Sequence, residues 1–93
     1  MWRAETNRMA TYIIYLSKKA TKQLNKLHDD VADPIIEAIG ALALIPRPYG
    51  CKKLKGRDAY RIRVGDYRIL YDIFDLELII DIIAMGHRKD IYK

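Results

Sequence analysis

Hydrophobic and polar residues alternate on both sides of a two-residue turn in the middle of the chain. The segment runs from Tyr60 to Tyr71, and Gly65-Asp66 interrupts it. A two-residue loop with glycine first is typical of a tight β-hairpin. Closing the turn there predicts five cross-strand pairs: Val64 with Tyr67, Arg63 with Arg68, Ile62 with Ile69, Arg61 with Leu70 and Tyr60 with Tyr71.

The predicted hairpin has a hydrophobic face and a basic face, and the basic face carries Arg61, Arg63 and Arg68. Like charges directly opposite each other destabilise a sheet. An anion or nearby carboxylates would have to offset that repulsion, and the planar guanidinium fork suits phosphate. We therefore interpret this face as a phosphate-binding surface. The alternatives are a solvated face, or arginines that pair with Asp72 and Asp81.

The remaining pattern predicts a strand, two helices and a further strand around this hairpin. Residues 12–16 are a short apolar run typical of a strand, and Ser17 suits the N-cap of a helix over residues 17–28. A second helix is expected to follow, with Asp29, Asp30 and Asp33 as candidate caps and Pro34 in its first turn. It is expected to end at Pro46, Pro48 and Gly50. Residues 46–57 are expected to form a basic loop, residues 75–77 a turn, and residues 78–85 a last, buried strand.

This order of elements predicts an α+β fold in which a helical hairpin packs on one face of a small antiparallel sheet. The buried side of the second helix is predicted to carry Ile35, Ile36, Ile39, Leu42 and Ala43. The arginines are expected on the other, open face of the sheet. We expect residues 9–93 to form a single domain and residues 1–8 to be a disordered extension.

Composition narrows the class of partner. The 93 residues carry a net charge of +5 with a pI of about 9.4, which favours a polyanion such as nucleic acid. Cys51 is the single cysteine, so an intrachain disulfide and a cysteine zinc site are excluded. No apolar run is long enough to span a bilayer, and no secretory signal is visible. We therefore expect a cytoplasmic location and no association with a membrane. No metal-ligand pattern is present, and we expect no cofactor.

Three segments resemble the RelE/ParE superfamily of toxins from type II toxin–antitoxin systems: residues 53–56, 60–71 and 86–92. The resemblance covers nearly the whole chain after Met9. The RelE branch is favoured, because Gly86-His87-Arg88 is followed by Tyr92. Two departures stand out. Well-studied RelE toxins have lysines at the positions of Arg61 and Arg63, and the interval from Arg88 to Tyr92 is shorter than in some members.

The resemblance implies a microbial RNase-like fold with the order β-α-α-β-β-β and a short C-terminal helix. It implies a ribosome-dependent endoribonuclease (an mRNA interferase) in which the 2′-hydroxyl attacks the adjacent phosphate and leaves a cyclic phosphate. A RelB-like antitoxin would block this activity, and the complex would bind operator DNA. Carried over by position, the family's catalytic residues fall on Arg61, Arg63, Arg68, Arg88 and Tyr92.

Chemistry restricts what each candidate could do. Arginine stays protonated, so the four arginines can hold phosphate and stabilise the transition state but are poor bases. Tyr92 could act as the base if nearby arginines lower its pKa, or could stack on a nucleobase. His87 is a further acid–base candidate, although a lone histidine is more often structural. Lys53, Lys55 and Arg57 are candidate RNA contacts, or simply a solvated basic loop.

Two other functions compete with the endonuclease. A ParE-type inhibitor of DNA gyrase shares the fold and cuts no RNA, and arginine instead of lysine at positions 61 and 63 keeps this alternative open. The third is a nucleic-acid-binding relative without catalytic activity. Because no strong general base is evident, we expect free RNA to be cut poorly and the ribosome to position the substrate.

Overall fold

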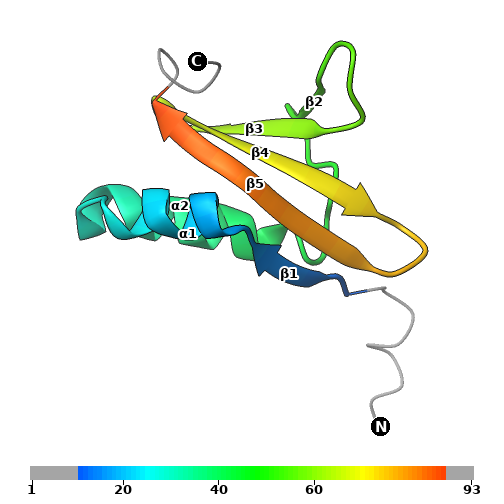
Figure 1. Ribbon diagram of the computed structural model, residues 1–93, viewed down its shortest axis with the longest axis horizontal. Coiled ribbons are helices and arrows are strands. Elements are labelled where there is room, and N and C mark those ends of the chain that lie inside the picture. Colours follow the sequence, from blue (N-terminus) through cyan, green and yellow to red (C-terminus); the bar gives the residue numbers. More distant parts are fainter. Residues whose placement is uncertain (1–10, 88–93) are drawn as a thin grey trace, which may run out of the picture.

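A computed structural model describes residues 11–87 and confirms the α+β fold. The expected extension at residues 1–8, the short C-terminal helix, Arg88 and Tyr92 lie outside the described residues. The elements, in chain order, are β1 Ile13–Leu16, α1 Lys18–Asn25, α2 Asp29–Ala41, β2 Lys52–Lys53, β3 Tyr60–Val64, β4 Tyr67–Phe74 and β5 Ile79–His87. The two helices lie together on one side of the sheet (Figure 1).

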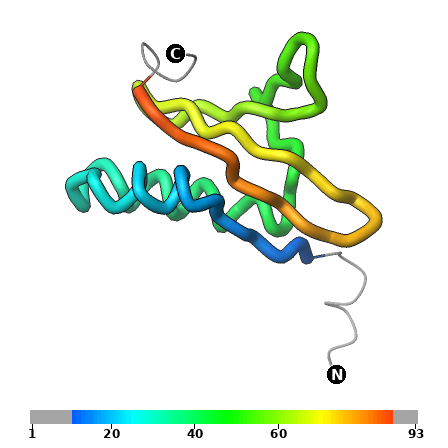
Figure 2. The backbone as a smooth tube through the Cα atoms, in the orientation of Figure 1, coloured from blue at the N-terminus to red at the C-terminus, as the bar shows by residue number. Residues whose placement is uncertain are grey.

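The five strands form one sheet in the order β1-β5-β4-β3-β2. The pairs β2–β3, β3–β4 and β4–β5 are antiparallel, but β1 runs parallel to β5. The sheet is therefore mixed, and the prediction of a wholly antiparallel sheet is wrong in this one pairing. Figure 2 shows why: the chain leaves β1, passes through both helices and the β3–β4 hairpin, and returns along β5 beside its own start. β5 is paired on both edges, which agrees with its largely apolar sequence.

The first helix begins where its cap predicts. The Ser17 hydroxyl accepts a hydrogen bond from the Ala20 amide at 3.0 Å and donates to the Ile83 carbonyl at 2.6 Å. The same side chain thus caps α1 and attaches it to β5. The helix ends at Asn25, three residues before the predicted end at His28.

The second helix begins earlier than predicted. His28 is its N-cap residue without a side-chain cap bond, Asp29 and Asp30 occupy the first turn, and Pro34 lies inside the helix. Acidic residues are favourable near the positive end of a helix dipole, and here they sit inside the helix rather than before it. Ile36 was predicted on the buried side but is 51% exposed.

The core lies between the helices and one face of the sheet. Its fully buried members include Ile35 of α2, Ile69 and Tyr71 of β4, and Ile80 and Ile82 of β5. The last strand begins at Ile79 rather than Leu78, because Leu78 has a φ of 58° and belongs to the turn. No helix among residues 11–87 is long and apolar enough to cross a membrane.

Candidate nucleic-acid interface

The β3–β4 hairpin has the predicted register in every pair. Arg63 lies opposite Arg68 and Arg61 lies opposite Leu70. Gly65 begins the two-residue turn with a φ of +61°, a conformation that side-chain-bearing residues rarely adopt. Because cross-strand partners share a face and side chains alternate along a strand, Arg61, Arg63 and Arg68 lie on one face of the sheet. This is the face that the helices leave uncovered.

Small and apolar residues surround the arginines on the neighbouring strand. β5 places Gly86 opposite Arg68 and Ala84 opposite Leu70, and both Ala84 and Leu70 are buried. Arg63 is exposed, and its Nε donates to the Gly65 carbonyl at 2.9 Å, so its side chain folds over the turn. Gly86 adds no side chain to the surface beside Arg68.

The structure adds Lys52 to this set. The predicted 46–57 loop contains the two-residue strand β2, which pairs Lys52 with Arg61. The Lys52 side chain therefore shares the face of Arg61, and we call Lys52, Arg61, Arg63 and Arg68 the basic patch. A two-residue strand is too short to show alternation, so the sequence held no signal for this placement beyond the abundance of lysine.

The three predicted loop contacts are distributed differently. Lys53 lies opposite Tyr60, and its Nζ is 3.3 Å from Oδ1 of Asp58. Alternation along β2 turns Lys53 away from the face of Lys52. Lys55 and Arg57 are exposed in the connection between β2 and β3. Lys55 and Arg57 are thus at the surface, while Lys53 pairs with a carboxylate.

His87 is separated from the basic patch. It ends β5 opposite Tyr67, and the two rings meet edge to face with centroids 5.8 Å apart. Tyr67 points to the helix side of the sheet, because it precedes Arg68 by one residue. His87 therefore shares the helix-side face, and its role as acid or base stays a prediction, as do the roles of Arg88 and Tyr92 beyond the described residues.

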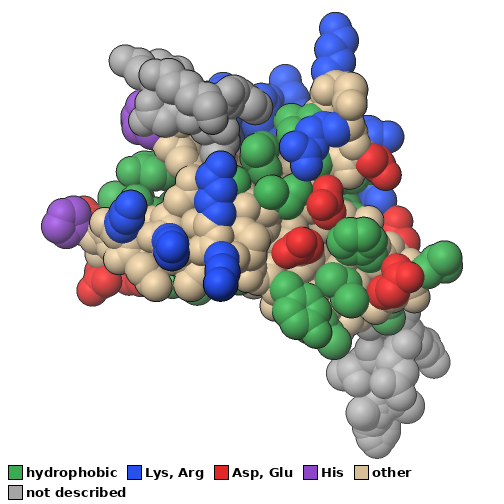
Figure 3. Space-filling view, in the orientation of Figure 1, with side chains coloured by type: hydrophobic (Ala, Val, Ile, Leu, Met, Phe, Trp, Pro, Cys, Tyr) green, Lys and Arg blue, Asp and Glu red, His purple; other side chains and the backbone are tan. Residues whose placement is uncertain are grey.

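The opposite end of the same open face is acidic and apolar. Asp72 lies directly opposite Asp81, and Tyr15, Phe74 and Ile79 line a hollow of about 350 Å³ beside them. Burial raises the pKa of Asp72, with Arg57 acting against this and Asp81 adding to it. In Figure 3, hydrophobic and acidic side chains gather over β1 and the β4–β5 turn, and basic side chains lie toward the β2–β3 connection. The basic end of this face therefore attracts an anion more strongly than the acidic end does.

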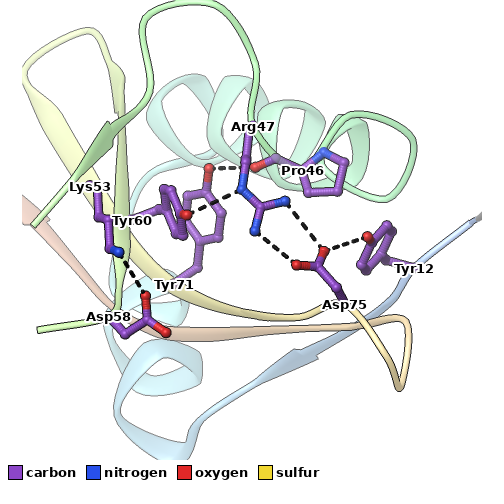
Figure 4. Close-up of polar contacts among 8 residues, drawn as sticks. All are labelled: Tyr12, Pro46, Arg47, Lys53, Asp58, Tyr60, Tyr71 and Asp75. Atoms are coloured by element: carbon purple, nitrogen blue, oxygen red, sulfur yellow. Dashed lines mark hydrogen bonds and ion pairs between the residues drawn. The ribbon is translucent and has the colours of Figure 1, made fainter.

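A polar cluster fixes the loop that leads to β2 (Figure 4). Arg47 donates to both carboxylate oxygens of Asp75, at 3.3 and 2.9 Å, and its Nε donates to the Tyr60 hydroxyl at 3.2 Å. Its guanidinium lies 5.1 Å from the Tyr60 ring centroid. Tyr12 also donates to Asp75, at 2.7 Å. We call this the Arg47–Asp75 cluster; it joins the loop after α2 to the β4–β5 turn and to the start of β3.

A buried hydrogen bond holds the backbone next to Arg47 in place. The hydroxyl of Tyr71, a residue with no exposed surface, donates to the Pro46 carbonyl at 2.7 Å, and the Tyr71 ring stacks on Tyr60. Burial raises the pKa of Tyr71 above its usual range. Hydrogen bonds from Arg47 and then from Tyr12 lower the pKa of Asp75. No local pattern predicts these contacts, because Arg47 and Asp75 are 28 residues apart.

These groups can hold phosphate without a metal. Among residues 11–87, no three His, Cys, Asp or Glu side chains are grouped so as to hold a metal ion. Three guanidinium groups and one ammonium on an open face can bind successive phosphates and stabilise charge on a phosphorus centre. They cannot accept a proton at neutral pH.

Comparison with known proteins finds a matching family model and similar solved structures, all from toxin–antitoxin systems. The family model described as the ParE toxin of the type II toxin–antitoxin system parDE matches residues 14–92. RelE of an archaeal RelE–RelB complex from Pyrococcus horikoshii OT3 is 29% identical, with a TM-score of 0.77 over 86% of this chain and 98% of that one. The toxin–antitoxin complex RelBE2 of Mycobacterium tuberculosis gives 29% identity and a TM-score of 0.76, covering 88% and 97%.

A third solved structure is the Escherichia coli toxin RelE, as a mutant in complex with a peptide of the antitoxin RelB. It is 25% identical to this chain, with a TM-score of 0.72 and 83% of each chain covered. No curated protein matches the chain. The family model is described for ParE and these three structures contain RelE toxins, so the relatives include both branches of the superfamily.

Proposed function

Because the chain belongs to the ParE toxin family of type II toxin–antitoxin systems, we propose that it is the toxin of such a pair and cleaves mRNA on the ribosome. The observation that carries this proposal is the basic patch. Arg63 faces Arg68, and Arg61 faces Leu70 on the same open surface. A bound anion would offset the repulsion between guanidinium groups placed opposite each other.

In the proposed reaction the 2′-hydroxyl oxygen attacks the adjacent phosphorus, and its proton passes to a base. The bond from phosphorus to the 5′-oxygen breaks, the 5′-oxygen takes up a proton, and a 2′,3′-cyclic phosphate remains. Arg61, Arg63 and Arg68 would hold the phosphate and stabilise the pentacoordinate phosphorus. Arg88 and Tyr92 enter through the family resemblance, with Tyr92 as the candidate base and Arg88 as a further phosphate contact.

The proposed partners are the ribosome, its mRNA and a RelB-like antitoxin. The relatives from P. horikoshii and M. tuberculosis were solved as toxin–antitoxin complexes, which supports the antitoxin. Operator DNA would be contacted through that complex, and all of these partners are cytoplasmic. The patch offers no strong base, so the ribosome would orient the substrate, and naked RNA would be a poor substrate.

The second candidate is a ParE-type inhibitor of DNA gyrase. Two points favour it: the matching family model is described for ParE, and this chain has Arg61 and Arg63 where the resemblance places lysines in well-studied RelE toxins. In this case the basic patch would bind the DNA or the enzyme rather than a scissile RNA linkage.

Induced expression separates the two candidates. Primer extension on mRNA from induced cells is expected to show new cleavage sites within translated regions, and these sites should vanish when translation initiation is blocked beforehand. A parallel assay with purified protein measures gyrase-dependent DNA breaks. Breaks without mRNA cleavage would replace the endonuclease by the gyrase inhibitor, and the absence of both would favour a non-catalytic relative.

A further inference from the structure

The open face of the sheet carries opposite charges at its two ends. The basic patch lies on β2, β3 and the start of β4. Along β4 and β5 the same face continues through the buried Leu70 and Ala84 to Asp72 and Asp81, which lie opposite each other. Glu77 in the β4–β5 turn adds a further carboxylate beside Asp81. The charge on this one face therefore reverses along β4, although the whole chain has a net charge of +5.

The acidic end also exposes large apolar side chains. Ile13 and Tyr15 of β1 lie opposite Ile79 and Asp81 of β5, so they share the open face. Ile13 is 58% exposed, Tyr15 54% and Phe74 45%, and these side chains gather over β1 and the β4–β5 turn (Figure 3). An exposed apolar surface rimmed by charged residues is typical of a protein–protein contact. We call the following residues the acidic–apolar patch: Ile13, Tyr15, Asp72, Phe74, Glu77 and Asp81.

We propose that two copies of this chain dimerise through their open faces, with the basic patch of each copy on the acidic–apolar patch of the other. A two-fold axis through the middle of the face, near Leu70 and Ala84, exchanges its two ends. Both contacts then form at once, and the assembly closes at two copies. The guanidinium groups of one copy would meet the carboxylates of the other, and their planes could stack on the Tyr15 and Phe74 rings.

Charge complementarity favours a second copy over other partners. Each patch places like charges opposite each other, with Arg63 across from Arg68 and Asp72 across from Asp81. Such pairs destabilise a sheet, and contact with a second copy would offset both of them, whereas a polyanion would offset only the first. Arg57 already acts on Asp72 within the chain. Glu77 and Asp81 are therefore the carboxylates on which we base the test.

The size of the face limits the strength of the dimer. β4 has eight residues in a five-stranded sheet. With a rise of about 3.3 Å per residue and about 4.8 Å between strands, the face covers roughly 500 Å². A standard interface buries about 800 Å² on each partner. The dimer is therefore expected to be weak, with a Kd in the micromolar range or above, and to dissociate on dilution.

Dimerisation would also control access to the basic patch. Because each basic patch is covered by the other copy, self-association and the binding of a polyanion exclude each other. Concentrated protein would be held inactive, and dilution or a competing polyanion would release the active monomer. This consequence rests on the function proposed above, whereas the dimer itself does not.

Two charge-reversal variants of the full-length protein test the dimer. Lys52→Glu with Arg63→Glu makes both ends of the face acidic, and Glu77→Lys with Asp81→Lys makes both ends basic. Sedimentation from about 1 μM to about 1 mM is expected to show a monomer–dimer equilibrium for the wild type. Each variant alone should associate at least about tenfold more weakly, and an equimolar mixture should regain association within about threefold of the wild type, because every contact then joins opposite charges.

Net charge alone cannot produce this pattern. The two variants have net charges four units below and four units above +5, so both remain positive and their mixture gains no overall attraction. Lys18→Glu with Lys19→Glu is the matched control, because both lysines are exposed on α1, on the helix side of the sheet. It changes the net charge as the first variant does and should dimerise within about threefold of the wild type. Thermal unfolding of every protein verifies that the fold is retained.

Four outcomes would overturn the proposal: a wild type that stays monomeric at the highest concentration, species larger than a dimer, a mixture that does not associate, or equal loss in the control. NMR chemical shifts that change on dilution outside the open face would also overturn it, because another surface would then form the contact. Cleavage of mRNA is scored separately, so failure of the proposed function is distinguishable from failure of the dimer.

Discussion

The two ends of the β3–β4 hairpin place arginine in opposite surroundings. At one end, Arg47 donates to both oxygens of Asp75 and lies against the Tyr60 ring. At the other end, Arg63 lies across from Arg68. The first arrangement satisfies a cation with a carboxylate and an aromatic ring, and the second sets two cations side by side.

This difference separates an arginine held in place by contacts within the fold from the arginines that we propose bind phosphate. Arg47 and Asp75 retain 44% and 52% of their side-chain exposure, so solvent screens their attraction and the pair itself adds little stability. The stronger contribution at that end is the buried Tyr71–Pro46 hydrogen bond. In the basic patch, by contrast, Arg63 lies opposite Arg68, and a bound anion is expected to stabilise the protein there. Four predictions test this contrast.

The largest expected effect is on cleavage. Arg68→Ala is expected to reduce mRNA cleavage on translating ribosomes about 100-fold or more, because it removes a donor to the charged transition state. Stability should change by less than about 1 kcal/mol, since lost packing is offset by relief of the repulsion with Arg63. Primer extension and thermal unfolding measure the two effects.

Lys19→Ala is the matched control for net charge, because Lys19 is an exposed residue of α1 on the opposite side of the sheet. It removes one positive charge and should leave cleavage within about twofold, as is usual for exposed sites away from special contacts. If both variants lost activity to the same degree, net charge rather than the patch would explain the function.

The next effect concerns the other end of the hairpin. Tyr71→Phe leaves the Pro46 carbonyl without its buried donor and is expected to lower the free energy of unfolding by about 1–2 kcal/mol. The arginine register should be unchanged, so the activity of the folded protein should persist at low temperature. Urea unfolding and cleavage assays below the transition check this; unaltered stability would show that the hydroxyl contributes nothing.

A smaller effect is expected from sulfate. If the basic patch is an anion site, sulfate at about tenfold over its Kd would stabilise the wild-type protein by about 1.4 kcal/mol. Arg68→Ala should show less stabilisation, whereas the non-specific effect of sulfate on burial is common to both proteins. Thermal scans with sodium chloride at matched ionic strength isolate the difference, and identical shifts in both proteins would count against the site.

The smallest effects concern pH, where two aspartates three residues apart should behave oppositely. Arg47 and Tyr12 lower the pKa of Asp75, so its contribution to stability is present above about pH 4 and is lost as the pH falls through the folded pKa. Burial raises the pKa of Asp72, so ionising Asp72 costs stability as the pH rises from about 4 through its folded pKa.

At neutral pH, Asp75→Asn should therefore destabilise the protein and Asp72→Asn should stabilise it. Both differences from the wild type should shrink as the pH is lowered to about 4 and below. Thermal unfolding of the three proteins over this range provides the test. Differences of the same sign in the two variants would show that the contrast between the carboxylates is wrong.

The sequence was most informative where one local pattern carried the structure. Alternation on both sides of Gly65-Asp66 predicted every pair of the hairpin and hence the shared face of Arg61, Arg63 and Arg68. Ser17 predicted the start of α1, because a serine directly before an apolar pattern of helical spacing is typical of an N-cap. The α+β fold and the RelE/ParE family were also predicted correctly.

The errors arose where local preference competes with contacts distant in sequence. Pro34 suits a first helical turn, yet α2 begins five residues earlier at Asp29. The parallel partner of β1 is more than 60 residues away in the sequence, so no local pattern predicts this pairing. Lys52 lies beside Arg61 only because a two-residue strand pairs with β3. Arg47 contacts Asp75 only because the folded chain brings the two residues together. Such contacts depend on topology rather than on periodicity.

The position of β5 also bears on how this protein is made. It lies between β1 and β4, yet it comes from residues 79–87, after the four other strands in chain order. An isolated two-stranded hairpin is marginally stable in water, so the guanidinium surface stays unformed while the nascent polypeptide lacks β5. A polypeptide shortened before residue 79 would therefore lose the basic patch together with the core.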